Sequence, residues 1–256
     1  MFRLAPFQAF MLAFYFAGVT ELVILLPKKQ GKTTLLAALA LYHLLMVPSA
    51  KCFVGASSGE QATWLYDQAA GFVIRSGLER RGVPPMSHRD RVEYEGVFDV
   101  RQGIHRIRFE QGFVRIVPHD VRTTDGVIPT LALVDELHRH PTGALYTAFR
   151  QGLVGNAQMI TISTPGATLD SPLGRLRERA REATSPERQG RRRTYRSADG
   201  SLVLVEYGLE DTDDPDDIRI VKQANPAPRR TVKALRQLRD SWSTTRGEWL
   251  RYVCGL

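Results

Sequence analysis

The sequence has little cysteine and no apolar run long enough to cross a membrane. Its two cysteines, Cys52 and Cys254, lie far apart and show no metal-type spacing. This usage argues against a disulfide framework and a zinc site, and it fits a reducing compartment. The apolar run over residues 9–19 has eleven residues, too few to span a bilayer, and no small-residue cleavage site follows it. We therefore expect a protein that is neither secreted nor bound to a membrane.

Composition and charge set broad limits on the fold and the partners. The chain has 256 residues, of which 43% are hydrophobic, so it can bury the core of one large or two small domains. Its formal net charge is +8, with a pI near 9.8. A balance of this kind points to a polyanionic partner without saying which one.

The most informative stretch runs from residue 22 to residue 46. An apolar segment, residues 22–26, breaks at Pro27, passes through a polar loop that ends in Gly31-Lys32-Thr33, and becomes a pattern rich in alanine and leucine. This order predicts a strand, a tight loop and a helix. The full phosphate-loop consensus has a glycine where Leu26 stands. A chance Gly-Lys-Thr before an ordinary helix is the alternative.

Such a loop captures anions. Backbone N–H groups around Gly31 and the helix N-terminus can surround phosphate oxygens, and Lys32 can reach the β- and γ-phosphates. The Thr33 hydroxyl can ligate Mg²⁺. The predicted nucleotide-binding segment comprises Pro27, Lys28, Lys29, Gln30, Gly31, Lys32, Thr33 and Thr34.

Two further apolar segments end in polar residues. Residues 130–134 suit a strand buried on both faces and lead into Asp135-Glu136. In a phosphate-loop enzyme the first acid would hold Mg²⁺ and the second would orient or deprotonate water. Residues 159–162 predict another strand, after which Ser163-Thr164 could sense a γ-phosphate. Adjacent acids also occur at ordinary strand ends, and a Ser-Thr-Pro-Gly turn can lack any catalytic role.

The N-terminal segment predicts a buried helix that leads to the first strand. Near its start, the amide of Gln8 can pair with the edge of an adenine, and the neighbouring Phe7 can cover the base. An ordinary surface glutamine is the alternative. Other predicted elements are strands at 51–56, 104–109 and 113–117, the last two forming a hairpin, and a helix over 62–76 with Ser58 as its N-cap.

The last third of the chain is strongly patterned in charge. Residues 175–196 contain nine arginines and three glutamates, beginning with a helix start at Ser171-Pro172. This basic face could follow a DNA backbone, or it could be a solvated helix followed by a disordered loop at 191–193. Residues 206–217 hold seven acids and no base, which suits an acidic loop or a solubilising linker. Helices at 218–224, 231–242 and around 248–253 suggest a small lid.

The series of motifs resembles the ATPase domain of tailed-bacteriophage terminase large subunits, in the branch whose phosphate loops also lack the leading glycine. The likeness covers essentially the whole chain. The segment LVDELH, residues 133–138, with the coupling motif that follows, is fairly specific. The segments that match are, in chain order, Pro6-Phe7-Gln8, Pro27 to Thr33, Gly55 to Ala62, Asp125-Gly126, Leu133 to His138, Ser163 to Gly166 and Asn225-Pro226.

The resemblance implies an α/β phosphate-loop NTPase of the additional-strand, catalytic-glutamate type, with a mostly parallel central sheet flanked by helices and a small helical C-terminal lid. It implies an ATPase core over residues 1–210 and a lid or linker over 211–256. The family's acid-rich nuclease domain is absent from this chain. Two departures are visible: Lys28 stands where the family usually has arginine, and Ser163-Thr164-Pro165 differs from the common Thr-Ala-Gly form.

The resemblance also implies a function, partners and a location. We expect an ATP-hydrolysing motor domain that uses ATP and Mg²⁺ to translocate double-stranded DNA into a procapsid. Its expected partners are DNA, a small terminase subunit, a nuclease domain in the full-length protein, and further copies in a ring, a pentamer, on the portal. The location is the host cytoplasm.

Motors of this kind need a cation that stabilises transition-state charge across a subunit boundary. Among Arg115, Arg122 and Arg150 we favour Arg122, because its loop precedes the acidic strand. Two other functions stay open. One is a helicase-like or remodelling nucleic-acid-dependent ATPase, and the other is a non-motor phosphate-loop nucleotide-binding module or small-molecule kinase.

Overall fold

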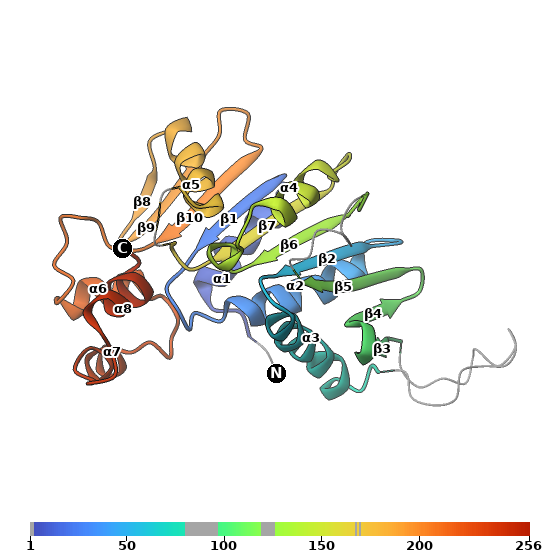
Figure 1. Cartoon of the computed structure of the whole chain (residues 1–256), viewed down its shortest axis with the longest axis horizontal. Helices are drawn as coiled ribbons and strands as arrows, with labels where there is room; N and C mark the ends of the chain where they lie inside the picture. Colours follow the sequence, from blue (N-terminus) through green and yellow to red (C-terminus); the bar gives the residue numbers. More distant parts are fainter. Residues whose placement is uncertain (1–2, 80–96, 119–125, 167, 169) are drawn as a thin grey trace, which may run out of the picture. The chain divides into compact units, whose positions relative to one another are not determined.

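The structure is a computed structural model that describes residues 3–79, 97–118, 126–166, 168 and 170–256 (Figure 1). Ten strands are hydrogen-bonded in the order β3-β4-β5-β2-β6-β7-β1-β10-β9-β8. The strands are β1 (Glu21–Leu25), β2 (Lys51–Ala56), β3 (Asp99–Arg101), β4 (Arg106–Phe109), β5 (Gly112–Pro118), β6 (Leu131–Asp135), β7 (Gln158–Ser163), β8 (Glu187–Gln189), β9 (Arg192–Arg196) and β10 (Leu202–Tyr207). The α-helices are α1 (Pro6–Phe16), α2 (Lys32–Met46), α3 (Gly59–Arg75), α4 (Ala144–Gln151), α5 (Pro172–Ala183), α6 (Ile218–Ala224), α7 (Val232–Arg239) and α8 (Arg246–Trp249).

The sheet is mixed and mostly parallel. β1 pairs in parallel with both β7 and β10, and β2 pairs in parallel with β5. Antiparallel strands occupy the two ends of the strand order, where β3 pairs with β4 and β8 pairs with β9. Helices pack on these strands: α1 contacts β1, α3 contacts β2 and β5, and α5 contacts β9 and β10. The predicted α/β class is therefore confirmed.

The chain divides into two compact units. The first comprises residues 1–32, 134–143 and 158–256, and the second comprises residues 33–133 and 144–157. Within the second unit, β2 matches the predicted strand at 51–56, and β4 and β5 form the predicted hairpin. Its helix α3 begins after Ser58, whose side chain accepts a hydrogen bond from the backbone of Gln61 at 3.2 Å. These local predictions are confirmed.

Within the first unit, β1 is buried along its whole length, as is most of β7. Strand β6, whose residues 131–133 belong to the second unit, is buried along its whole length as well. Continuous apolar strands of this kind belong in the interior of a parallel sheet. The predicted N-terminal helix is α1, and the predicted helix after β1 is α2, which begins at Lys32. No helix in the described parts of the chain has the length and apolar character that a membrane span needs.

The charged segment after α5 is built differently from our prediction. Residues 192–196 form strand β9, so residues 192 and 193 do not belong to the disordered loop that was one of our two alternatives. Glu206 lies in strand β10 rather than in an acidic loop. Glu206 is fully buried and pairs with three arginines, Arg177, Arg181 and Arg193. Charge patterning alone suggested that these arginines are solvated. Their charges are instead compensated by a buried carboxylate.

The C-terminal helices share a small core of their own. α6 matches the prediction at 218–224, α7 lies within the predicted segment 231–242, and α8 continues into a π-helical turn over Leu250–Cys254. The indole N–H of Trp249 donates to the carbonyl of Pro215 at 2.9 Å, which ties α8 to the chain before α6. The buried side chains of this cluster are Leu209, Ile218, Val221, Ala224, Leu235, Trp249, Val253 and Cys254.

Candidate nucleotide-binding site

The loop between β1 and α2 is a tight turn held on both sides. Its two residues in the left-handed region are Lys29, with φ of 65°, and Gly31, with φ of 81°. The backbone N–H of Leu26 donates to the carbonyl of Ser163 at 3.0 Å, and that of Lys28 donates to Tyr252 at 2.8 Å. The loop is therefore fixed by β7 and by the C-terminal π-helical turn, not by its own sequence alone.

Lys32 is buried at the first position of α2 and gathers the polar groups around it. Its ammonium donates to the Thr164 hydroxyl at 2.8 Å and to the carbonyls of Pro27 and Leu26 at 3.2 and 3.3 Å. It also lies 3.2 Å from Glu136 Oε1. Burial lowers the pKa of Lys32, and the charge of Glu136 opposes that change.

Glu136 follows β6 directly and adopts a left-handed backbone, with φ of 50°. A non-glycine residue in this region is strained, and such strain is frequent at functional sites. One carboxylate oxygen accepts from the backbone N–H of Thr164 at 2.9 Å and lies 3.0 Å from His138 Nδ1. Burial alone would raise the pKa of Glu136, but the hydrogen bond from His138 and the charge of Lys32 lower it to about 2. The carboxylate is therefore ionised at neutral pH.

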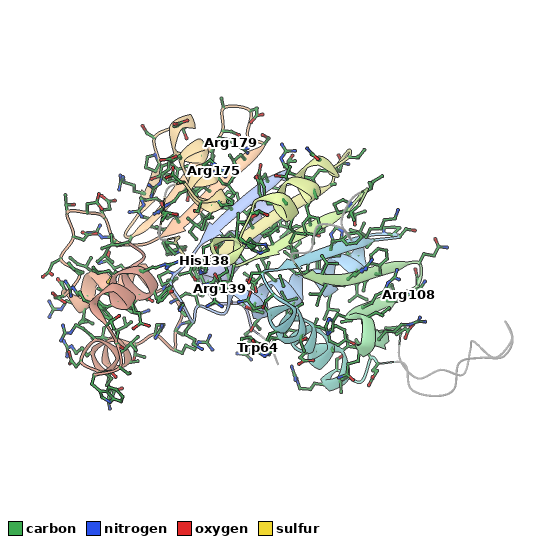
Figure 2. All side chains as sticks on the ribbon, viewed as in Figure 1. Trp64, Arg108, His138, Arg139, Arg175 and Arg179 are labelled. Atoms are coloured by element: carbon green, nitrogen blue, oxygen red, sulfur yellow. The ribbon has the colours of Figure 1, made fainter. Side chains whose placement is uncertain are left out.

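His138, Ser163 and Thr164 complete the surroundings of this carboxylate. The Ser163 hydroxyl donates to the Thr164 carbonyl at 3.0 Å and accepts from the backbone N–H of His138 at 3.3 Å. His138 lies in the 3₁₀ turn Leu137–Arg139, which begins after Glu136, beside Arg139 (Figure 2). We predicted sites at Ser163 and Thr164 but assigned no role to His138, although it lies within the LVDELH segment.

Asp135 is the last residue of β6 and is 4% exposed. Its backbone carbonyl accepts a hydrogen bond from His140 Nε2 at 3.1 Å, which fixes the turn after the strand. Thr33 is the second residue of α2. A carboxylate and a hydroxyl are hard oxygen donors of the kind that Mg²⁺ takes, so these two residues fit the ion that a phosphate loop needs.

Gln8 lies in the first turn of α1 and is buried. Its Oε1 accepts from the backbone N–H of Ala5 at 3.0 Å, while a Cβ atom added to Gly31 would lie 3.4 Å from its Nε2. The predicted adenine-binding residue therefore sits beside the loop. Phe7 is also buried, and its ring packs edge-on against Tyr207 with centroids 6.3 Å apart. Its cover of a base stays a prediction.

Sequence reasoning missed how the loop is joined to the segment after α6. Gln30 Nε2 donates to Asn225 Oδ1 at 2.8 Å, and Gln30 Oε1 accepts from the backbone of Ala227 at 2.9 Å. Arg229 donates twice to the carbonyl of Lys29, and Arg230 donates to the carbonyl of Lys28 at 3.0 Å. The Asn225-Pro226 pair was the signal that could have led to this connection.

Lys28 stands where the family usually has arginine, and its side chain is engaged. The ammonium lies over the ring of Tyr252, 3.1 Å from the centroid. This is a cation–π contact with the C-terminal π-helical turn. The contact orients Lys28 without the planar fork of an arginine.

The predicted basic face is partly turned inward. Besides the arginines around Glu206, Arg179 pairs with Glu21 at 2.8 Å and Arg191 pairs with Asp213. Arg175 and Arg179 are exposed on α5 (Figure 2). Arg122, our predicted transition-state cation, lies outside the described residues, so its role stays a prediction. Of the two arginines we set aside, Arg115 lies in β5 and Arg150 in α4.

The fold and the site define a class. A buried lysine at the start of a helix, a glycine-containing turn before it and an ionised glutamate at the end of a sheet strand make an α/β protein with a phosphate-binding loop. A family model described as the terminase large subunit ATPase domain matches residues 6–182. The chain belongs to this family, whose members supply the ATP-hydrolysing domain of phage DNA-packaging motors.

Known proteins and structures agree with this assignment. Protein YmfN of Escherichia coli K12 is 29% identical over 133 residues, which is 51% of this chain and 27% of that protein. The large terminase of bacteriophage HK97 has 21% identity and a TM-score of 0.72, over 99% of this chain and 50% of that one. The large terminase of a thermophilic bacteriophage, in complex with ATP-gamma-S, has 9% identity and a TM-score of 0.62, over 99% of this chain and 53% of that one. The chain therefore spans about half the length of these two terminases and 27% of the length of protein YmfN.

Proposed function

We propose that this chain hydrolyses ATP to ADP and phosphate as the motor domain of a viral terminase that moves double-stranded DNA into a procapsid. The observation that carries the proposal is the meeting of Lys32, Glu136 and Thr164 within hydrogen-bonding distance. These residues lie at the start of α2, after β6 and after β7. A lysine, a carboxylate and a hydroxyl in one buried site are the groups that phosphoryl transfer uses to bind phosphate, to activate water and to sense the γ-phosphate.

Nucleotide binding uses the loop and its surroundings. The backbone N–H groups from Lys29 to Gly31 surround the phosphates, together with those of Lys32, Thr33 and Thr34 at the helix N-terminus. Lys32 contacts the β- and γ-phosphates, and the Gln8 amide pairs with the adenine edge. Mg²⁺, held by Thr33 and Asp135, supplies charge neutralisation of the phosphates when it is bound.

Hydrolysis uses Glu136 as the base that orients and deprotonates water. In the arrangement described above, the carboxylate is occupied by Lys32, His138 and the backbone of Thr164. A γ-phosphate competes for the Lys32 ammonium, and the carboxylate then becomes available to water. Thr164 contacts both partners of this exchange, and Ser163 contacts Thr164 and His138, so the two residues pass the change to the rest of the chain.

The finer fold assignment supports the same function. In the strand order, β7 stands between β1, which leads to the loop, and β6, which leads to Glu136. This order supports the proposal of an additional-strand, catalytic-glutamate NTPase. The helices after residue 211 serve as a lid that moves with the nucleotide state, and residues 1–210 form the ATPase core.

The partners and the location belong to the proposal as well. The motor works on double-stranded DNA as a homo-oligomeric ring, a pentamer, on the portal of a procapsid in the host cytoplasm. A small terminase subunit and a nuclease domain of the full-length protein act with it. An arginine donated across the subunit boundary, Arg122, stabilises transition-state charge.

The test is the rate of ATP hydrolysis with and without double-stranded DNA. We expect DNA to raise the rate, and we expect Lys32→Ala to abolish both nucleotide binding and turnover. Turnover that ignores DNA would instead support a non-motor nucleotide-binding module. Separation of the strands of a short duplex would support a helicase-like ATPase.

A further inference from the structure

The base of a bound nucleotide needs a second contact besides Gln8. The Gln8 amide can pair with the edge of an adenine, but edge hydrogen bonds leave both faces of the ring without cover. The ring of Phe7 packs edge-on against Tyr207, so a further contact with the base is open to a neighbouring residue. The residue that makes this contact must lie next to both Gln8 and the loop.

Arg229 has this position. Its Nε and Nη2 both donate to the carbonyl of Lys29, at 3.2 and 3.1 Å, and the residue is exposed. Gly31 connects it to Gln8: a Cβ added to Gly31 would lie 4.0 Å from Arg229 Nη2 and 3.4 Å from Gln8 Nε2. The guanidinium and the amide therefore both lie close to the same point of the loop.

We propose that Arg229 stacks its guanidinium on the adenine whose edge Gln8 binds. The inference rests on the proposed nucleotide-binding function and names a further contact within it. A guanidinium is planar and always charged, and it stacks on aromatic faces. Two hydrogen bonds to one carbonyl fix its plane before the nucleotide arrives, so little side-chain freedom is lost on binding.

Arg230 provides an internal comparison. It also donates to the backbone of the loop, at the carbonyl of Lys28, but its Nε is buried. Burial lowers the pKa of Arg230, and the neighbouring charge of Arg229 adds to this. The contact of Arg230 with the loop is therefore partly buried, whereas Arg229 contacts the loop from a position that is exposed and open to a ligand.

Stacking on a base and positioning of the loop predict different losses. If Arg229 stacks on the base, its removal weakens the binding of every ligand that carries the base. The affinity for a ligand that has only phosphates is then unchanged. A distorted loop, by contrast, weakens phosphate binding itself. Inorganic tripolyphosphate, which binds through the phosphate loop but has no base, separates the two effects.

The experiment is isothermal titration of the full chain with ADP and with inorganic tripolyphosphate. We expect Arg229→Ala to weaken ADP binding roughly tenfold, the usual scale of one stacking contact, and to change tripolyphosphate affinity less than twofold. Arg229→Lys, which keeps the charge but loses the plane, should fall between this variant and the wild type. Arg219→Ala, which removes an exposed arginine of α6, is the matched control and should bind both ligands normally.

Two results overturn the inference. One is an Arg229→Ala chain that binds ADP within twofold of the wild type. The other is an equal loss for ADP and tripolyphosphate, as we expect for Arg230→Ala, because this would make Arg229 a residue that only positions the loop. A wild-type chain that binds neither ligand would instead remove the proposed function, and the inference with it.

Discussion

The ammonium of Lys32 lies 3.2 Å from Oε1 of Glu136, and both side chains are largely buried. The two opposite charges therefore stabilise each other in a site that excludes most water. The Lys32 contact also occupies the base that the proposed reaction needs. A nucleotide that draws Lys32 to its phosphates frees the carboxylate at the moment when the substrate is bound.

Glu136→Gln should separate binding from hydrolysis. Glutamine keeps the shape and one acceptor oxygen, but it cannot take a proton from water. We expect turnover to fall by a factor of about 100 or more, the usual share of a general base, while ADP affinity changes little. Comparison of steady-state ATPase rates with ADP titrations checks this. Glu60→Gln, an exposed change on α3, is the control, and equal losses of binding and turnover would remove Glu136 from the catalytic role.

Acid should remove the stabilisation that Glu136 gives. Because its pKa falls from an ordinary 4.5 to about 2, its contribution is complete above about pH 5 and is lost as the pH falls toward 2. Between pH 6 and pH 3 this amounts to about 2 kcal/mol, a loss that Glu136→Gln cannot show. Urea unfolding of both chains at each pH measures it. If the difference in the free energy of unfolding between the wild type and Glu136→Gln did not change with pH, the low pKa of Glu136 would be contradicted.

Local patterns were enough to predict the parts of the chain that a few adjacent residues decide. The loop before α2 follows from an apolar strand, a proline and the Gly31-Lys32-Thr33 ending. The bounds of α6 follow from Asp217, whose side chain caps the helix, and from the Asn225-Pro226 pair at its end. In each case the signal lies within the element or next to it.

Contacts between distant polar residues could not be predicted in this way. Gln30 and Asn225 are separated by 195 positions, and the Asn225-Pro226 pair does not by itself identify Gln30 as its partner. Strand β9 was missed because its charge suggested solvent, and Glu206 in the otherwise apolar strand β10 was assigned to an acidic loop. Arg193 and Glu206 are register partners in the antiparallel pair, so two charges compensate each other inside the protein. Only the fold reveals that pairing.

Loss of the buried carboxylate of Glu206 should be costly. Burial alone would raise its pKa, but the charges of Arg177, Arg181 and Arg193 hold it below the ordinary value. Glu206→Gln leaves these three arginines without their common partner, which should lower the free energy of unfolding by about 3–5 kcal/mol. Glu187→Gln removes a surface partner 3.6 Å from Arg192 and should cost less than about 1 kcal/mol. Similar losses in the two variants, measured by urea unfolding, would contradict a buried role for Glu206.

Asn225 should link the stability of the C-terminal helices to nucleotide binding. Its Nδ2 donates to the carbonyls of Val221 and Val253, at 2.9 and 2.7 Å, while its Oδ1 accepts from Gln30. Asn225→Ala leaves these buried partners unsatisfied, so we expect a loss of about 2–4 kcal/mol in the free energy of unfolding.

The same change frees Gln30 from its position in the loop, so ADP affinity should fall as well. Thermal unfolding with and without ADP measures both effects on one sample. The shift in midpoint that ADP produces should be smaller for Asn225→Ala than for the wild type, because the weakened loop gives the ligand less binding energy. Asn156→Ala, an exposed change, should unfold and respond to ADP as the wild type does. If Asn225→Ala unfolded earlier but kept the full ADP shift, Asn225 would serve the helices alone and Gln30 would hold the loop without it.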